Sequence, residues 1–219
     1  MICALFDLDG TLTDPGIGIT SAVQYAAKKL GFDAPDRTKF YDFIGPPLRE
    51  SFAKRFSLTE DEAETAVGYY REYYRPKGIF ECELYPGIKE TLEKFYSSGH
   101  RLGVATVKPE VFAVKIAEHF GIAKYFEFIA GSELDNSRDK KADVIRRAMT
   151  NIDYAYPDNT VMVGDRDYDI IAAKEIGIRS IGAVYGYGTE EELKAAGADR
   201  LVYGASEIHG ALRSLFIKD

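Results

Sequence analysis

The sequence predicts a doubly wound, Rossmann-like α/β fold, in which helices cover a parallel sheet and a helical insert follows the first strand. Two observations support this fold class. Short β-rich apolar runs recur along the chain, and runs that are apolar on both faces are typical of parallel strands buried under helices. From residue 85 onward, amphipathic segments with helix start and stop signals separate these runs. The predicted strands are residues 2–6, 101–106, 126–131, 160–165, 179–186 and 200–204.

The segments between these strands carry helix punctuation. Pro109 opens one of them at a first-turn position, and Gly121 ends it. Thr189 and Glu192 stand in capping-box spacing at the start of another, which closes on Gly197. Strands that alternate with helices favour βαβ units and a parallel sheet. The predicted helices of this part are residues 87–99, 109–121, 141–150, 169–177 and 189–197.

Residues 15–80 interrupt the alternation, because they contain no convincing strand. Four helical patterns fill this stretch, and the last of them begins with Thr59 and Glu62 in capping-box spacing. The segment therefore reads as a helical insert between the first strand and the rest of the sheet. Its predicted helices are residues 19–31, 36–45, 48–56 and 59–78.

Length and charge limit the classes of function. The chain has 219 residues, and we assign residues 1–14 and 82–219 to an α/β core and residues 15–81 to the insert. Twenty-eight basic and 35 acidic residues give a net charge of −7, without a long block of one sign. Binding to a nucleic-acid backbone needs a basic surface, so this composition argues against a nucleic-acid polymer as partner. Small anionic substrates stay open, because a local site can be positive on an acidic protein.

Cysteine usage and hydropathy indicate the compartment. The two cysteines, Cys3 and Cys82, allow only one pair, so a disulfide framework is excluded and a reducing compartment is favoured. The N-terminus lacks a basic start followed by a long apolar stretch, and no run approaches the ~18 apolar residues of a membrane span. We expect a soluble cytoplasmic protein without a membrane partner.

Carboxylates gather where predicted strands end. Asp7 and Asp9 end the first strand, in the stretch "LFDLDGTLT". Asp165 ends the strand 160–165, and Asp169 follows four residues later on the same side of the next helix. Ligands of open α/β sheets bind at the carboxyl ends of the strands. Clustered carboxylates repel one another unless a cation neutralises them, and hard oxygen ligands without nearby His or Cys favour Mg²⁺.

Each of these features also has an ordinary explanation. Asp9-Gly10 is a common turn, and Asp165 is a normal helix cap. Thr106, at the end of the second predicted strand of the core, can hold a phosphate oxygen but is also a usual strand residue. Lys141 opens a helix, where a cation opposes the helix dipole, but it also suits a solvated surface. The two aspartate segments together, each at a predicted strand end, favour a catalytic or ligand-binding role over these ordinary explanations.

The four features together resemble a known family. Asp7-Leu8-Asp9-Gly10-Thr11, Thr106, Lys141 and Gly164-Asp165-x-x-x-Asp169 are similar in order and position to the motifs of haloacid dehalogenase (HAD) superfamily phosphatases. The resemblance covers essentially the whole chain and identifies the insert with the family's small helical cap. The stretches "SELDNSRDKKADVI" and "VGDRDYDIIAAKEIGI" resemble the phosphoglycolate phosphatase and 5'-nucleotidase-like branch. This resemblance places the lysine of the third motif at Lys141 rather than at its neighbour Lys140.

The resemblance implies a covalent mechanism. Asp7 would attack phosphorus and form an aspartyl-phosphate, and Asp9 would act as general acid and then as general base. Mg²⁺ would be bound by the Asp7 carboxylate, the Asp9 backbone carbonyl and Asp165. Asp169 would bind the ion through water or orient Lys141. The metal set implied by the family is thus Asp7, Asp9, Asp165 and Asp169.

The same resemblance implies the groups that bind substrate. Thr106, the backbone N–H of Val107 and Lys141 would hold the phosphoryl oxygens. The family's second motif often continues Thr-Asn-Lys or Thr-Ser-Lys, whereas this chain has Val107 before Lys108. The backbone N–H is retained, but a polar side chain near the leaving group is lost. Arg49, in the insert, either meets an anionic group of the substrate or lies on a helix surface.

The sequence therefore predicts a Mg²⁺-dependent phosphatase that acts on a small phosphomonoester such as phosphoglycolate or a nucleoside monophosphate. A sugar-phosphate phosphomutase is the first alternative, although residues 15–20 lack the histidine usual in that branch. Dehalogenation is disfavoured by Asp9, and phosphonoacetaldehyde hydrolysis would need a cap lysine, for which Lys54 has no distinguishing mark. A non-enzymatic phospho-ligand binding protein stays open. We expect a monomer or a weak homodimer.

Overall fold

The computed structural model describes residues 1–134, 140–153 and 155–216. These residues divide into two compact units. Unit 1 comprises residues 1–14 and 84–219, and unit 2 comprises residues 15–83. No helix of the described part is long and apolar enough to cross a membrane. The functional assignment of unit 2 as a cap stays a prediction.

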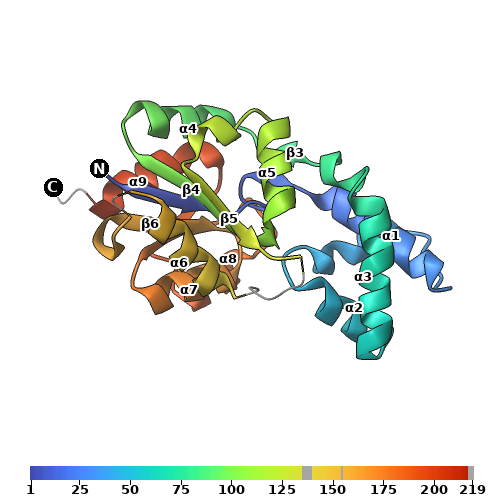
Figure 1. The fold of residues 1–219 in the computed structure, drawn as a ribbon. Coiled ribbons are helices and arrows are strands. Elements are labelled where there is room, and N and C mark those ends of the chain that lie inside the picture. Colours follow the sequence, from blue (N-terminus) through green and yellow to red (C-terminus); the bar gives the residue numbers. More distant parts are fainter. Residues whose placement is uncertain (135–139, 154, 217–219) are drawn as a thin grey trace. The chain divides into compact units, whose positions relative to one another are not determined.

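Unit 1 is built around a six-stranded parallel sheet (Figure 1). The strands lie in the order β5-β4-β1-β6-β7-β8, so β1 is flanked by β4 and β6, and the chain order changes direction at β1. Ligand sites of open α/β sheets form at such a switch point. The predicted parallel α/β sheet is confirmed. The strands are β1 (Cys3–Phe6), β4 (Arg101–Pro109), β5 (Phe128–Ser132), β6 (Thr160–Gly164), β7 (Arg179–Ala183) and β8 (Arg200–Val202).

The side chains of β1 alternate between two apolar layers. Cys3 and Leu5 pack with Met162 and with Ile145, which lies on a helix beside the sheet. Phe6 points to the other face and makes edge contacts with the rings of Phe95 and Phe126. Both faces of the strand are therefore buried, which explains why its sequence is a continuous apolar run rather than an alternating one.

Helices cover the sheet of unit 1 (Figure 1). Helix α6 packs against α7, and α4 packs against α9. The sequence did not predict α9, nor the two short strands β2 (Thr13–Asp14) and β3 (Glu83–Leu84), which pair as a separate ribbon. The helices of this unit are α4 (Ile88–Ser97), α5 (Glu110–His119), α6 (Lys141–Asn151), α7 (Asp167–Ile176), α8 (Glu190–Ala196) and α9 (Ile208–Phe216).

Unit 2 is helical, as the sequence predicts. Thr59 and Glu62 form the full capping box of α3. The segment expected as a helix at 36–45 is a 3-10 segment, Arg37–Phe43, whose backbone leaves helical geometry at Phe40. The remaining elements of this unit are α1 (Gly16–Lys29), α2 (Leu48–Phe56), α3 (Glu60–Tyr74) and a second 3-10 turn at Gly78–Phe80.

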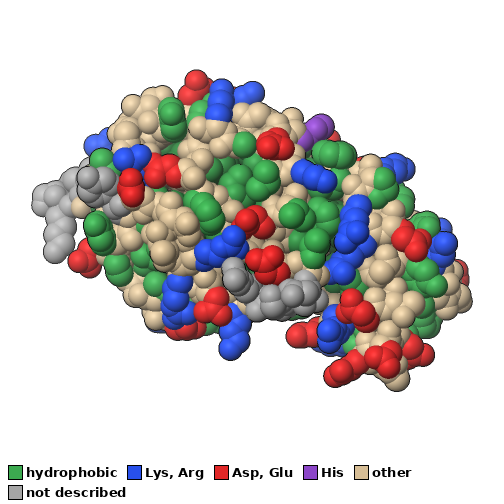
Figure 2. Space-filling view, in the orientation of Figure 1, with side chains coloured by type: hydrophobic (Ala, Val, Ile, Leu, Met, Phe, Trp, Pro, Cys, Tyr) green, Lys and Arg blue, Asp and Glu red, His purple; other side chains and the backbone are tan. Residues whose placement is uncertain are grey.

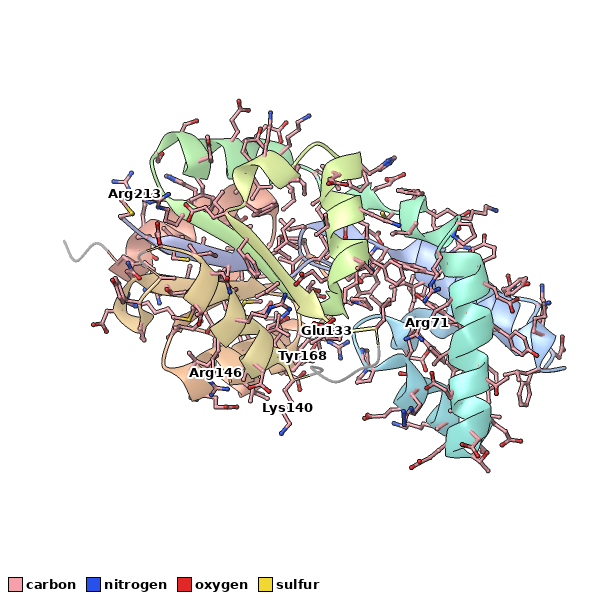
Figure 3. All side chains as sticks on the ribbon, in the orientation of Figure 1. Arg71, Glu133, Lys140, Arg146, Tyr168 and Arg213 are labelled. Carbon is pink, nitrogen blue, oxygen red and sulfur yellow. The ribbon has the colours of Figure 1, made fainter. Side chains whose placement is uncertain are left out.

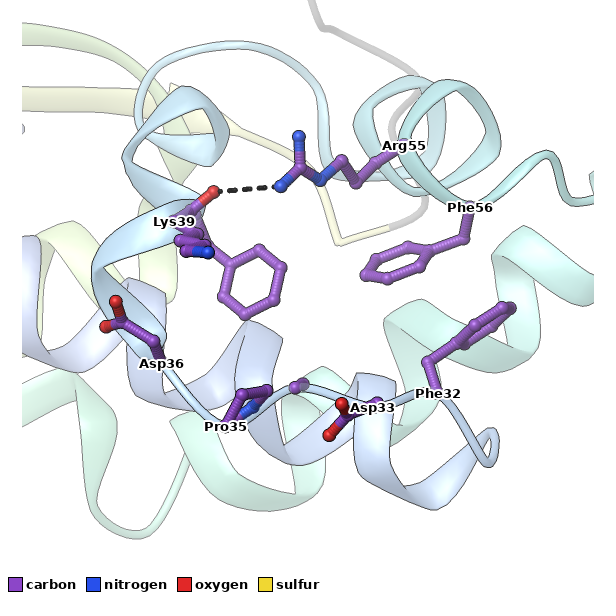
Figure 4. Close-up of a pocket in the computed structure, with 9 residues that line it drawn as sticks. Phe32, Asp33, Pro35, Asp36, Lys39, Arg55 and Phe56 are labelled. Atoms are coloured by element: carbon purple, nitrogen blue, oxygen red, sulfur yellow. Dashed lines mark hydrogen bonds between the residues drawn. The ribbon is translucent and has the colours of Figure 1, made fainter.

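Aromatic side chains form the interior of unit 2. Phe43 packs edge-on against Phe52, with ring centroids 5.0 Å apart, and both side chains are buried. A pocket of about 430 Å³ opens beside this core, between the rings of Phe32 and Phe56 and the side chain of Arg55 (Figure 4). Arg55 donates a hydrogen bond of 3.3 Å to the backbone carbonyl of Lys39, and both residues line the pocket.

Candidate active site

The first acidic residue continues the sheet. The Asp7 N–H donates to the Val163 carbonyl at 2.9 Å, which extends the pairing of β1 with β6 by one residue. The chain then turns tightly, because the N–H groups of Leu12 and Thr13 both donate to the Leu8 carbonyl at 2.9 Å. Gly10 has a φ of +89°, and a Cβ there would lie 2.1 Å from a carboxylate oxygen of Asp165. Only glycine fits this turn.

Lys141 joins two of the carboxylates. Its Nζ lies 2.6 Å from Asp7 Oδ1 and 2.7 Å from Asp169 Oδ1, and all three side chains are at most 4% exposed. Burial lowers the pKa of the Lys141 ammonium, but the charges of Asp169 and Asp7 outweigh burial and raise that pKa above its ordinary value. The dipole of α6 disfavours a cation at its first residue, and the two carboxylates compensate for this placement.

Asp165 follows β6 and is held from two sides. The Thr11 hydroxyl donates to its Oδ1 at 3.2 Å, and the Tyr187 backbone N–H donates to its Oδ2 at 2.9 Å. The loop around Tyr187 approaches closely because glycines flank that residue. A Cβ at Gly186 would lie 2.3 Å from the Gly10 carbonyl oxygen, and a Cβ at Gly188 would lie 1.9 Å from the Asp165 carbonyl oxygen. The orientation of the Asp165 carboxylate is thus fixed before any ligand binds.

The three carboxylates carry more charge than the cluster neutralises. Carboxylate oxygens of Asp7, Asp165 and Asp169 all lie within 4.8 Å of one another, and all three residues are buried. Lys141 supplies one positive charge, and within the described residues no lysine or arginine forms an ion pair with Asp165. Burial, followed by repulsion from Asp169 and Asp7, raises the pKa of Asp165 well above its ordinary value. Burial likewise raises the pKa of Asp169 to about 6, although Lys141 opposes the rise.

This arrangement fits a divalent cation. Three carboxylates and one ammonium leave two negative charges in a buried place, which is costly without a counter-charge. The donors are hard oxygens with separations that one small ion can span, which is the ligand chemistry of Mg²⁺. The Asp9 side chain does not belong to this group of three.

Asp9 forms an ion pair with a second lysine, Lys108. Lys108 Nζ lies 2.5 Å from Asp9 Oδ2, with side-chain exposures of 6% and 14%. Burial raises the pKa of the Asp9 carboxyl above its ordinary value, while the charge of Lys108 pulls it down. The sequence does not assign Lys108 to the site and leaves open whether this lysine contacts substrate. The available signal was its position two residues after Thr106, because alternate residues of a strand share a face.

The remaining predicted residues belong to three different elements. Thr106 is buried near the end of β4, where its Oγ1 accepts a hydrogen bond of 3.2 Å from the Lys108 N–H, and Val107 is half-buried between them. Lys140 is exposed, and Figure 3 shows its side chain directed away from the sheet, so the buried lysine of α6 is Lys141. Arg49 lies on α2 in unit 2, with its Nε 3.4 Å from a Glu64 oxygen and its side chain 46% exposed.

A second network orders the helix that carries Asp169. The Glu192 carboxylate accepts hydrogen bonds from Arg166 Nε at 2.8 Å and from the Asp167 N–H at 3.0 Å. Thr189 still accepts from the Glu192 N–H, so only one half of the predicted capping box of α8 forms. The carboxylate that would complete the box instead caps the first turn of α7.

The comparison with protein families identifies the family of the chain. The haloacid dehalogenase-like hydrolase family matches residues 4–183. The chain belongs to that family. The sequence-based assignment to HAD hydrolases is therefore confirmed, and the matched span contains the carboxylates Asp7, Asp9, Asp165 and Asp169 and the lysines Lys108 and Lys141.

Curated relatives cover most of the chain. A 5'-nucleotidase of Pseudomonas aeruginosa is 46% identical over 191 residues, which are 87% of this chain and 86% of that protein. A tyrosine-protein kinase, PtkA of Mycobacterium tuberculosis, is 39% identical over 84% of this chain and 62% of its own length. A phosphoglycolate phosphatase of Vibrio parahaemolyticus is 32% identical over 93% of this chain and 92% of its own length.

A solved structure has the same fold. A crystal structure described as a predicted phosphatase from Clostridium acetobutylicum has a TM-score of 0.91 at 44% identity, and the match covers 97% of this chain and 98% of that one. The chain is a HAD-like enzyme of the phosphoric monoester hydrolase class, as the sequence predicts.

Proposed function

We propose that this enzyme is a Mg²⁺-dependent phosphatase that hydrolyses a small phosphomonoester through an aspartyl-phosphate on Asp7. The observation that carries the proposal is the buried cluster of Asp7, Asp165 and Asp169 at the switch point of the sheet, in which Lys141 pairs with Asp7 and Asp169 and leaves Asp165 without a cation among the described residues. Its uncompensated charge suits a divalent cation, and its nucleophile follows directly after β1.

Asp7 acts as the nucleophile, and Asp9 acts as the general acid and then as the general base. A carboxylate oxygen of Asp7 forms a bond to phosphorus while the bond to the leaving oxygen breaks, and Asp9 donates a proton to that oxygen. Water then attacks the phosphorus of the aspartyl-phosphate, Asp9 accepts a proton from the water, and inorganic phosphate leaves with the Asp7 carboxylate regenerated. Burial raises the pKa of Asp9, which favours the protonated form that the first step needs.

The phosphoryl oxygens need donors in fixed places. Lys141 is rigid because two carboxylates hold its ammonium. We assign phosphoryl binding to Lys141, to the Thr106 hydroxyl and to the Val107 N–H. Thr106 and Val107 lie in the last part of β4, the strand that pairs with β1, and Lys141 is the first residue of α6. Bound Mg²⁺, held by Asp7, Asp165 and the Asp9 backbone carbonyl, would offset the charge that accumulates on the transferring oxygens.

The relatives and the charge of the chain support the proposed substrate class. A 5'-nucleotidase and a phosphoglycolate phosphatase both match over more than four fifths of their length, which supports a nucleoside monophosphate, phosphoglycolate or a similar metabolite. Figure 2 shows acidic and basic side chains interspersed on the visible face, without a continuous basic patch. We propose that the enzyme acts in the cytoplasm as a monomer or weak homodimer, without a nucleic-acid or membrane partner. We also propose that Arg49 contacts the leaving group of the substrate.

A phosphate-release screen tests the proposal. Purified protein is incubated with p-nitrophenyl phosphate and a panel of phosphorylated metabolites, once with Mg²⁺ and once with EDTA. We expect release from small phosphomonoesters that requires Mg²⁺ and is lost in Asp7→Asn, which keeps the size of the side chain. Full activity of Asp7→Asn with Mg²⁺ present would contradict the proposal.

The same screen separates the alternatives. Conversion of one hexose phosphate isomer into another, without net phosphate release, would identify a phosphomutase. Ligand-dependent thermal stabilisation without turnover of any substrate would identify a phospho-ligand binding protein. Preferential turnover of a phosphoprotein would contradict the assignment of a small substrate.

A further inference from the structure

The contact between Lys108 and Asp9 supports a role that the proposed function does not assign. We propose that Lys108 is a positioning residue for the general acid–base: it holds Oδ2 of Asp9 and so presents Oδ1 for proton transfer. This inference rests on the proposed function, because it takes Asp9 as the group that protonates the leaving oxygen.

The first observation is the fixed place of the lysine. Its backbone N–H donates to Thr106 Oγ1 at 3.2 Å, and its Nζ lies 2.5 Å from Asp9 Oδ2. Only 6% of the Lys108 side chain is exposed. A long, flexible side chain loses most of its rotamer freedom in such a place, and a buried ammonium is costly unless it is paired. The pair is therefore a specific contact rather than a surface ion pair.

The second observation is that the two oxygens of Asp9 differ. Oδ2 receives the ammonium, whereas Oδ1 is buried and accepts no hydrogen bond from any residue that the structure describes. Buried acceptors in proteins nearly always have a partner, and an exception often marks a catalytic group. A carboxylate with one anchored and one unpartnered oxygen is ready to exchange a proton with a ligand at the second oxygen.

The third observation is that the two catalytic carboxylates are anchored separately. Lys141 contacts Asp7 and Asp169, while Lys108 contacts Asp9. The Asp9–Lys108 pair has no net charge, so it leaves the charge balance of the three-carboxylate cluster unchanged. Loss of Lys108 should therefore impair proton transfer and spare the nucleophile and the cation site.

Substrates with different leaving groups separate an effect on proton transfer from an effect on the nucleophile or the cation site. An alkyl phosphate expels a basic alkoxide that needs a proton, whereas p-nitrophenyl phosphate expels an acidic phenolate that needs little help. kcat/KM covers the steps through phosphoenzyme formation, so its ratio for the two substrates isolates the general-acid step. The test compares Lys108→Met, Lys108→Arg and Asp9→Asn, with Lys115→Met as a matched control for an exposed lysine on α5. The alkyl substrate is the best one from the phosphate-release screen.

We expect Lys108→Met to lose about 10–100-fold more kcat/KM with the alkyl phosphate than with p-nitrophenyl phosphate, in the same direction as Asp9→Asn. Lys108→Arg should recover part of that selective loss, because it restores a cation at Asp9. Mg²⁺ affinity measured by titration calorimetry should stay within about threefold of wild type in Lys108→Met, and Lys115→Met should behave as wild type.

Equal losses with both substrates, or no loss, while Asp9→Asn shows the selective loss, would overturn the role of Lys108. If Lys108→Met does not fold, Lys108→Gln, which also removes the ammonium, provides the same ratio, with Lys108→Arg as the variant that keeps the cation. A uniform effect of Asp9→Asn on both substrates would refute the acid–base assignment itself and the present inference with it. Full activity of Asp7→Asn would instead refute the proposed function, so the two failures are distinguishable.

Discussion

The charge balance of the carboxylate cluster predicts how the metal-free enzyme responds to pH. The pKa of Asp169 rises from an ordinary value of 3.8 to about 6 in the folded chain. Between these two values the folded state binds more protons than the unfolded state, so its stability falls as pH rises. The full penalty, about 3 kcal/mol, is present above pH ~6 and absent below pH ~3.8. For a chain of this length that corresponds to about 6–12 °C in melting temperature.

The assay compares the wild type with Asp169→Asn in EDTA, by thermal melting followed with circular dichroism from pH ~4 to pH ~7. The amide side chain of the variant cannot ionise, so the melting temperature of the wild type should fall relative to that of the variant by up to about 6–12 °C across this range. Saturating Mg²⁺ should remove most of the fall in the wild type. A pH-independent difference between the two proteins, or a wild type that gains on the variant as pH rises, would refute the reasoning.

Three further outcomes concern the stability of single-residue variants. Lys141→Met leaves two buried carboxylates without their cation, so it should cost about 3–5 kcal/mol of stability in EDTA, measured by thermal melting. Gly188→Ala places a methyl group 1.9 Å from the Asp165 carbonyl oxygen, so it should cost about 1–3 kcal/mol and weaken Mg²⁺ binding in titration calorimetry. Gly68→Ala, on α3 with nothing within 4 Å of the new Cβ, should instead raise stability by about 1 kcal/mol, and a loss would contradict the helix argument.

The sequence predicted those parts of the site that depend on strand ends. Asp7 and Asp165 end apolar runs, and parallel pairing of β1 with β6 brings those ends together. The buried lysine could be assigned to Lys141 through the family motif, and the structure shows it between two carboxylates. Local pattern and sheet topology agree at these positions, which is why short motifs were sufficient.

The contacts that the sequence did not predict depend on tertiary partners. β4 continues to Pro109 although Lys and Pro are poor strand residues, and this extension carries Lys108 to Asp9. The capping box of α8 formed only in half because Arg166 and Asp167 compete for the Glu192 carboxylate. Such competition arises between segments distant in the chain, and local spacing carries no signal for it.

The sequence did not predict helix α9 because the local helix propensity of this segment is weak. Its nine residues include Gly210, which costs about 1 kcal/mol relative to Ala in a helix interior. Burial of Ile208 and Leu212 against the core compensates for that weak propensity. The helix thus owes its stability to packing, which becomes visible only when the sheet is in place.

Capture of the phosphoenzyme tests the central claim most directly. Asp9→Asn should still form the aspartyl-phosphate from p-nitrophenyl phosphate but hydrolyse it slowly, because the base for the attacking water is missing. After acid quench in the presence of Mg²⁺, peptide mass spectrometry should find one phosphoryl group on Asp7, and none in the Asp7→Asn/Asp9→Asn double variant. A phosphoryl group on another residue, or undiminished turnover by the double variant, would contradict the account.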